Sequence, residues 1–246
     1  SFTPAGEFYG SEMDARGVKF IVDKGAGPTG LCVVLVTPDG ERTLQTSLGA
    51  SVTLTENDIR SDWIENCQFV YLEGYLWGSP VTARAAEVAV HLAAKSGSKI
   101  AISFSDTSMT DAFGDDITRV TREFVDVVFC NEGEAKSYSK STDRMEALTN
   151  VARDCPLVFM TCGGDGSFIS DQGKIFAVNA YPVVPIDTTG AGDAYAAGVL
   201  YGLTHGLTPF ESAKLGTYAA AQVVMRIGPR LKENLSDQVA SIIAGE

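Results

Sequence analysis

The stretch Pro185-Ile-Asp-Thr-Thr-Gly-Ala-Gly-Asp193 lies between an apolar run, residues 181–186, and a run of small and apolar residues, 194–203. This order predicts a strand, a tight glycine turn and then a helix. In such a turn the backbone amides are not covered by side chains, and the positive end of the helix dipole points at the same place. An anion is therefore expected beside the carboxylate of Asp193. The turn residues are Gly190, Ala191 and Gly192.

A carboxylate next to an anion hole suits phosphoryl transfer, because it can take a proton from an alcohol while the amides stabilise the transferring group. A simple turn followed by a capped helix needs the same residue types, so the short Gly-Ala-Gly-Asp pattern leaves both interpretations open. The longer stretch resembles the C-terminal signature of the ribokinase-like (PfkB) family of carbohydrate and nucleoside kinases. The resemblance implies that Asp193 is the catalytic base and that the Gly-Ala-Gly amides bind the γ-phosphate of ATP.

The composition indicates one globular domain over residues 1–246, because 45% of the residues are apolar and 20% are charged. No segment approaches the roughly 20 consecutive apolar residues that cross a membrane. The net charge of -12 argues against nucleic acid and anionic membrane surfaces as partners. None of the five cysteines forms a Cys-x-x-Cys pair, which favours buried, reduced thiols and a cytoplasmic location.

From residue 52 onward, short apolar strands alternate with helices, which predicts a mostly parallel sheet covered on both faces. We therefore expect a three-layer α/β/α fold, and the resemblance specifies the ribokinase-like version of it. The expected strands are residues 68–72, 99–103, 126–130, 157–161 and 181–186. The expected helices begin near Ala5, Thr55, Pro80, Asp115, Glu132, Arg144, Ala194, Pro209 and Ser236.

Two hairpins are expected in addition. Residues 31–37 and 42–46 flank the turn signal Pro38-Asp-Gly-Glu41, and residues 167–170 and 174–178 flank a second turn. The resemblance implies that the first hairpin, about residues 31–47, is a small β-lid.

Polar residues follow the expected strands at their carboxyl ends, where ligands of parallel sheets collect. Asn131 and Glu134 share one turn of a helix start, and their oxygens can hold a hydrated Mg²⁺. Acidic residues at a helix start are also favoured by the dipole alone. The pattern resembles the Asn-x-x-Glu motif of the family, which implies a magnesium and nucleotide site.

A second polar segment, Thr161-Cys-Gly-Gly-Asp-Gly166, follows another expected strand. Its glycines let a phosphate approach the backbone, although an ordinary turn would use the same residues. The resemblance implies that Thr161, Gly163, Gly164 and Gly166 contact ATP, and that Thr217 lies beside its adenine or ribose. No P-loop, dinucleotide-binding or α/β-hydrolase motif is present.

The resemblance also implies a monovalent cation, such as K⁺, beside the anion hole. Its ligands are expected near Asp187, Thr189, Val223 and Gly228.

The implied function is ATP-dependent phosphorylation of a hydroxymethyl group on a sugar or nucleoside, of the adenosine, ribose or fructose type. The segment Tyr71–Tyr75 resembles adenosine-kinase-like members, although its aromatic residues are also expected in a core.

Family members begin with a further strand and a Gly-Gly-x-x-x-Asn segment that has no counterpart here. Three explanations remain open: a longer parent protein, a shortened variant, or a substrate site rebuilt from other residues. An open sheet edge invites pairing, so a homodimer through this edge or the lid is expected. A non-catalytic nucleotide-binding or assembly module that has lost the sugar site is the alternative function.

Overall fold

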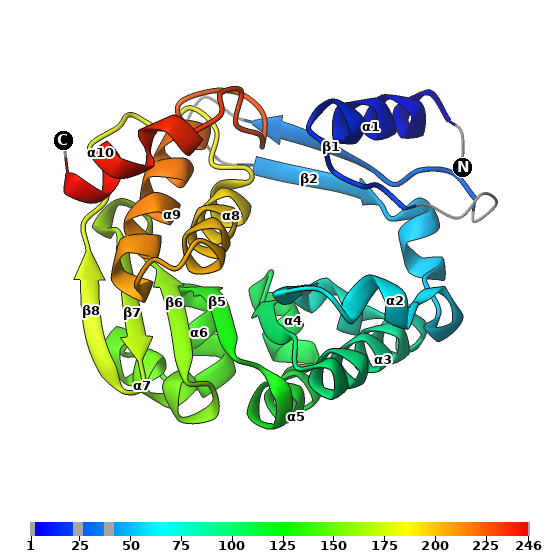
Figure 1. Cartoon of the computed structure of the whole chain (residues 1–246), viewed down its shortest axis with the longest axis horizontal. Coiled ribbons are helices and arrows are strands. Elements are labelled where there is room, and N and C mark those ends of the chain that lie inside the picture. Colours follow the sequence, from blue (N-terminus) through cyan, green and yellow to red (C-terminus); the bar gives the residue numbers. More distant parts are fainter. Residues whose placement is uncertain (1–2, 22–26, 37–41, 246) are drawn as a thin grey trace.

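Six strands form the central sheet in the order β3-β4-β5-β6-β7-β8. Figure 1 labels β5 to β8 of this sheet. The computed structural model describes residues 3–21, 27–36 and 42–245. The pairs β3–β4, β4–β5 and β5–β6 are parallel, whereas β6–β7 and β7–β8 are antiparallel. The sheet is therefore mostly parallel, as predicted. The strand bounds are β3 Phe69–Glu73, β4 Lys99–Ser103, β5 Val127–Asn131, β6 Leu157–Thr161, β7 Ser167–Asp171 and β8 Lys174–Val178.

Successive residues of the strands enter two separate cores, one on each face of the sheet. In β5, Val128 packs into the core formed with one set of helices, whereas Val127 and Phe129 pack into the other. The first set is α3 (Pro80–Ser96), α5 (Gly114–Phe124), α6 (Glu132–Ser139) and α7 (Arg144–Asp154); the second is α8 (Ala191–Thr204) and α9 (Pro209–Val224) (Figure 1). This arrangement confirms the three-layer α/β/α fold.

Several helix ends lie where the sequence signals place them. Ser79 caps α3, Pro80 is its first residue, and Gly97 ends it in the left-handed conformation with φ 78°. The helix expected from Thr55 is only a 3-10 turn, Glu56–Asp58, followed by α2 (Ser61–Ile64). Helix α4 (Thr107–Ala112) was not predicted, and the last helix is a 3-10 turn, Ser236–Gln238, followed by α10 (Val239–Ala244).

The strand predicted over residues 181–186 is wrong. This segment belongs to no sheet. Pro182 and Pro185 have no backbone N–H, so the segment cannot donate the regular series of hydrogen bonds that pairs a strand with its neighbour. Its end is fixed instead by the carbonyl of Val224, which accepts from the amides of Ile186 at 2.7 Å and Asp187 at 3.2 Å.

The N-terminal part contributes α1 (Pro4–Ala15) and a separate two-stranded antiparallel sheet of β1 (Leu31–Val36) and β2 (Arg42–Ser47). A 3-10 turn, Gly49–Thr53, follows. The hairpin lies apart from the central sheet (Figure 1). The turn predicted at Pro38–Glu41 lies outside the described residues.

Two further expectations concern the thiols and the membrane. All five cysteines are free, and Cys130 and Cys155 are buried. Cys32 and Cys67 are exposed, so the prediction of buried thiols is wrong for these two. Among the described residues, none of the helices combines the length and the apolar composition that a bilayer crossing requires.

Helices α8 and α9 pack so closely that glycine is needed between them. A Cβ atom on Gly198 would lie 2.8 Å from the Cα of Gly216. Gly198→Ala is therefore expected to lower the free energy of unfolding by about 1 to 3 kcal/mol through overpacking. Helix propensity alone predicts the opposite, a gain of about 1 kcal/mol.

Urea denaturation measures this effect, with Gly114→Ala as the matched control. Gly114 also lies in a helix, and a Cβ atom there meets nothing within 4 Å. The control should be unchanged or slightly stabilised. A gain in stability for Gly198→Ala would show that the two helices can separate without cost.

Candidate active site

The N-terminus of α8 exposes backbone donors without a side-chain cap. Its N-cap residue, Gly190, has φ 79° and no side-chain acceptor. A Cβ atom there would lie 2.6 Å from the carbonyl oxygen of Pro229, so only glycine fits this turn. In the described part of the chain, the amides of Gly192 and Asp193 have no backbone partner. These amides and the helix dipole together form a site for an anion.

The anion hole differs in one detail from the expected set of donors. The amide of Ala191 donates to the carbonyl oxygen of Thr188 at 3.3 Å. Among the described residues, the amides without a backbone partner are therefore those of Gly190, Gly192 and Asp193. The carboxylate of Asp193 lies in the same first turn and is exposed to solvent.

Asp187 holds the turn that leads into α8. Its buried carboxylate accepts from the amide of Thr189 at 2.9 Å and from the amide of Gly228 at 3.1 Å. The structure thus brings together Asp187, Thr189 and Gly228 of the expected cation set. The side chain of Val223 is fully buried, and its carbonyl accepts from the amide of Arg226 at 3.3 Å.

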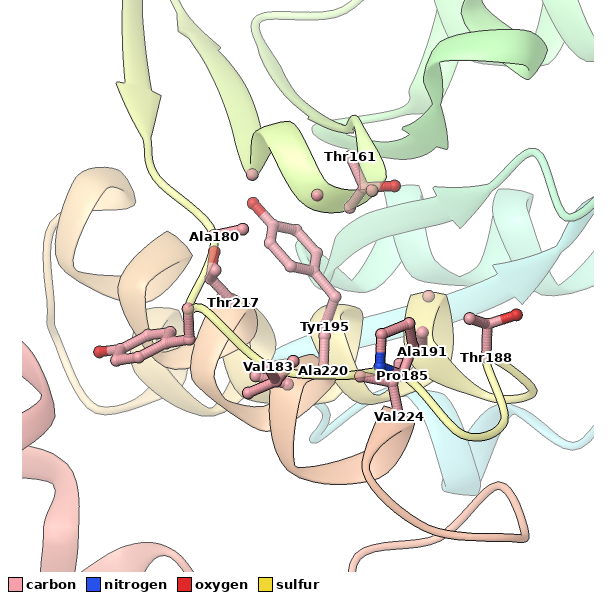
Figure 2. Close-up of a pocket in the computed structure, with 16 residues that line it drawn as sticks. Thr161, Ala180, Val183, Pro185, Thr188, Ala191, Tyr195, Thr217, Ala220 and Val224 are labelled. Carbon is pink, nitrogen blue, oxygen red and sulfur yellow. The ribbon is translucent and has the colours of Figure 1, made fainter. Parts of the chain in front are cut away.

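A cavity of about 280 Å³ lies beside this helix start, and it joins the three segments expected to bind the nucleotide (Figure 2). Val183, Pro185, Ala220 and the buried Tyr195 form part of its wall (Figure 2). The hydroxyl of Tyr195 donates to Ser167 Oγ at 2.9 Å. A small apolar cavity with backbone donors at one end suits a planar base joined to phosphates. The expected residues that line it are Thr161, Gly163, Gly164, Gly166, Ala191, Gly192 and Thr217.

Asn131 and Glu134 form a capping box at the start of α6. The amide of Asn131 donates to Glu134 Oε2 at 2.9 Å, its side-chain amide donates to Glu134 Oε1 at 2.6 Å, and the amide of Glu134 donates to Asn131 Oδ1 at 2.9 Å. Burial raises the pKa of Glu134 to about 7, and the charges of Asp106 and Glu73 act in the same direction.

This pair fits a hydrated Mg²⁺. Within the described residues, no group of three or more His, Cys, Asp or Glu side chains is placed to hold a metal. Mg²⁺ keeps most of its waters and needs only one or two protein carboxylates when phosphates supply the other ligands. A cation would also offset the cost of the buried carboxylate charge.

Glu73, at the end of β3, is a partly buried carboxylate whose contacts the sequence argument did not predict. Ser105 Oγ donates to Glu73 Oε2 at 2.7 Å and accepts from the amide of Gly74 at 2.8 Å. Burial raises the pKa of Glu73, and the charge of Asp193 adds to this effect. The signal was an acid directly after an apolar strand.

The aromatic residues around Glu73 divide into two groups. The ring of Tyr71 lies 6.1 Å from that of the core residue Phe129. Tyr75 is 57% exposed, so the prediction that it belongs to a core is wrong. Its hydroxyl donates to the carbonyl oxygen of Ser105 at 3.2 Å, because the chain turns out of the sheet at Gly74.

Comparison with known proteins decides the family. Residues 3–235 match the pfkB family of carbohydrate kinases. The chain belongs to this family. An adenosine kinase from Saccharomyces cerevisiae is 31% identical to this PfkB chain over 242 residues, which cover 89% of the chain and 68% of the relative.

Two solved structures share both fold and sequence with this PfkB chain. A probable sugar kinase from Rhizobium etli CFN 42 superposes with a TM-score of 0.94 and 34% identity, over 100% of this chain and 75% of that one. The adenosine kinase from Sinorhizobium meliloti superposes with a TM-score of 0.93 and 35% identity, over 98% of this chain and 75% of that one. The chain spans 63% to 69% of the length of the curated adenosine kinases that it matches.

Proposed function

We propose that this PfkB chain transfers the γ-phosphoryl group of ATP to a hydroxymethyl group of a sugar or nucleoside. The observation that carries the proposal is the convergence of three distant segments on one cavity beside the open start of α8. The kinase names of the relatives favour this function over a non-catalytic assembly module. The match to a ribokinase, at 25% identity, keeps sugars among the candidate substrates.

Each residue of the site has a proposed role. The carboxylate of Asp193 takes the proton from the attacking hydroxyl, whose oxygen forms a bond to the γ-phosphorus as the bond to the leaving ADP oxygen breaks. The amides of Gly192 and Asp193 stabilise charge on the transferring group. Gly190 allows the tight turn that presents these amides, because a side chain at this position would clash with Pro229.

The remaining cavity residues would hold the nucleotide. Thr161 and the glycines of the 163–166 turn lie at one side of it, and Thr217 lies in the wall formed by α9 (Figure 2). Asn131 and Glu134 would orient the Mg²⁺ that neutralises the phosphates. A monovalent cation near Asp187 and Gly228 would steady the turn that carries the anion hole.

Adenosine or a related nucleoside is the substrate class best supported. Several matched relatives from different organisms are adenosine kinases. Glu73, partly buried at the end of β3, is a hydrogen-bond acceptor that would bind a hydroxyl of the ribose.

Gly192→Val tests the nucleotide site. A Cβ atom on Gly192 meets no atom within 4 Å, so the added side chain would occupy the cavity and the anion hole. We expect Mg-ATP affinity to fall by at least about tenfold, which corresponds to about 1.4 kcal/mol, when titrated by calorimetry.

Gly114→Val is the matched control. Gly114 also lies in the first turn of a helix and is open to a Cβ atom, but it does not line the cavity. The affinity of the Gly114→Val variant for Mg-ATP should equal that of the unchanged chain. Equal affinity in Gly192→Val would place the phosphates elsewhere.

We further propose a homodimer through the β1–β2 hairpin. Leu31, Val33 and Leu35 lie on one face of the hairpin and are 59%, 58% and 61% exposed. A two-stranded sheet is marginally stable alone, and a row of exposed apolar side chains commonly marks an interface.

Val33→Lys should convert this dimer to a monomer in light scattering after gel filtration. Leu44→Lys is the control, because Leu44 pairs with Val34 and lies on the opposite face of the same hairpin. A monomeric unchanged chain at micromolar concentration contradicts the dimer.

A further inference from the structure

Arg144, the first residue of α7, joins the two turns that leave the neighbouring strands β5 and β6. Its Nε donates to Glu132 Oε2 at 2.7 Å, and its Nη2 donates to Asp165 Oδ2 at 2.8 Å. Glu132 lies between Asn131 and Glu134 at the start of α6, whereas Asp165 lies in the glycine turn of residues 163–166.

The two turns are adjacent because their strands are paired. Asn131 and Thr161 are register partners at the ends of β5 and β6. Beyond these residues the chains separate, one into α6 and the other into the glycine turn. Besides the hydrogen bonds inside the turn, which link Cys162, Gly163, Asp165 and Gly166, the Arg144–Asp165 ion pair ties the turn to a neighbouring element.

The environment of Arg144 is built to hold its guanidinium group in one place. Lys136 Nζ donates to the other oxygen of Glu132 at 2.6 Å, so Glu132 is fixed from two sides. The guanidinium carbon also lies 5.8 Å from the ring centre of Phe168 in β7. Arg144 is 32% exposed and Glu132 is 25% exposed, whereas Asp165 is 65% exposed. The arginine end of the pair is therefore held by several contacts, whereas Asp165, in the turn, is the exposed end.

We infer that Arg144 is a positioning residue that fixes the glycine turn 163–166 against Asn131 and Glu134, so that the nucleotide cavity and the magnesium site keep one relative placement. The inference rests on the proposed function for the identity of the ligand. Arg144 touches neither the cavity nor Asp193, so its effect reaches the nucleotide through Asp165 and the turn.

An arginine is needed for this role. Its planar fork reaches Glu132 and Asp165 at the same time, whereas a lysine carries a single point charge. Arg144→Lys should therefore keep part of the restraint, and Arg144→Gln should lose it. Asp165→Asn removes the charge from the link to the turn, leaving at most a neutral hydrogen bond, and keeps Arg144 bound to Glu132. This exposed substitution therefore separates the positioning role from folding.

The control is Arg122→Gln. Arg122 Nε donates to Asp154 Oδ1 at 2.7 Å, at the opposite end of the same helix α7, and neither residue lines the cavity. The control removes a comparable arginine–aspartate link from α7 while leaving the glycine turn untouched.

Two measurements test the inference. Hydrogen exchange of the ligand-free chain should be faster at the amides of residues 163–166 in Arg144→Gln and Asp165→Asn, and unchanged in Arg122→Gln. Mg-ATP affinity by calorimetry should fall about three- to tenfold in the first two variants, with an intermediate loss in Arg144→Lys and no loss in Arg122→Gln. The KM for the phosphate acceptor should stay constant.

Unchanged exchange in the 163–166 turn would overturn the inference, and so would faster exchange with unchanged Mg-ATP affinity. Failure of the unchanged chain to bind Mg-ATP would contradict the proposed function instead. The exchange rates would in that case still decide whether Arg144 holds the turn.

Discussion

Asp193→Asn is expected to lower kcat by about 10²- to 10⁴-fold, the usual contribution of a general base. The asparagine has nearly the same shape but cannot accept the proton of the attacking hydroxyl. Mg-ATP affinity should change little, because the amides of Gly192 and Asp193 keep their places at the start of α8. Steady-state kinetics together with calorimetry separates the two effects.

The matched control for this variant is Asp116→Asn. Asp116 is the third residue of α5, as Asp193 is the third residue of α8, and both are exposed. Each substitution removes the same favourable interaction with a helix dipole. Only Asp193→Asn should lose turnover. Full turnover in Asp193→Asn would assign the base to another group.

The second large effect is expected for Glu134→Gln. The glutamine keeps an oxygen for the amide of Asn131 but cannot supply an ionised carboxylate to hydrated Mg²⁺. We expect a loss of roughly 10- to 100-fold in kcat/KM at limiting Mg²⁺, the range typical of a changed metal environment. Raising the Mg²⁺ concentration should recover part of it.

The same substitution should change how stability depends on pH. Burial raises the pKa of Glu134 from its ordinary value of 4.5 to about 7, so the folded chain binds more protons than the unfolded chain between these values. The contribution of Glu134 to stability is therefore present below about pH 4.5 and is lost as the pH rises through about 7. As the pH rises from about 4.5 to about 7 without Mg²⁺, the free energy of unfolding of Glu134→Gln should therefore increase by about 2 to 3 kcal/mol relative to that of the unchanged chain.

Glu211→Gln is the control for both measurements. Glu211 occupies the same capping-box position in α9, where it accepts from the amide of Thr208 at 2.9 Å. Its side-chain and backbone hydrogen bonds from Thr208 lower the pKa of Glu211, so it cannot produce the same pH trend. If the difference in free energy of unfolding between Glu134→Gln and the unchanged chain did not vary with pH, burial would not disfavour the ionised form of Glu134.

Most of the fold could be predicted from the sequence because its signals are local. The β4 and β6 bounds follow from short apolar runs, and α3 follows from Ser79, Pro80 and Gly97. The segment 181–186 failed because its apolar pattern resembles a strand while its two prolines remove the donors that a sheet needs. Helix α4 was missed because its six residues carry no apolar periodicity.

The candidate site was predicted where one short segment carries the chemistry, and missed where distant segments meet. The turn before α8 and the glycines after β6 are contiguous patterns. The position of Glu73 depends on its hydrogen bond from Ser105, which lies far away in the chain. The Arg144 links to Glu132 and Asp165 likewise depend on the pairing of β5 with β6, which single residues do not reveal.

The central claim is best tested by ADP release from Mg-ATP in the presence of K⁺, measured across a panel of nucleosides and sugars. We predict substrate-dependent release, strongest with adenosine or a closely related nucleoside, that persists in Asp116→Asn and disappears in Asp193→Asn. Mg-ATP binding without release for any member of the panel would contradict the claim and indicate a nucleotide-binding module instead.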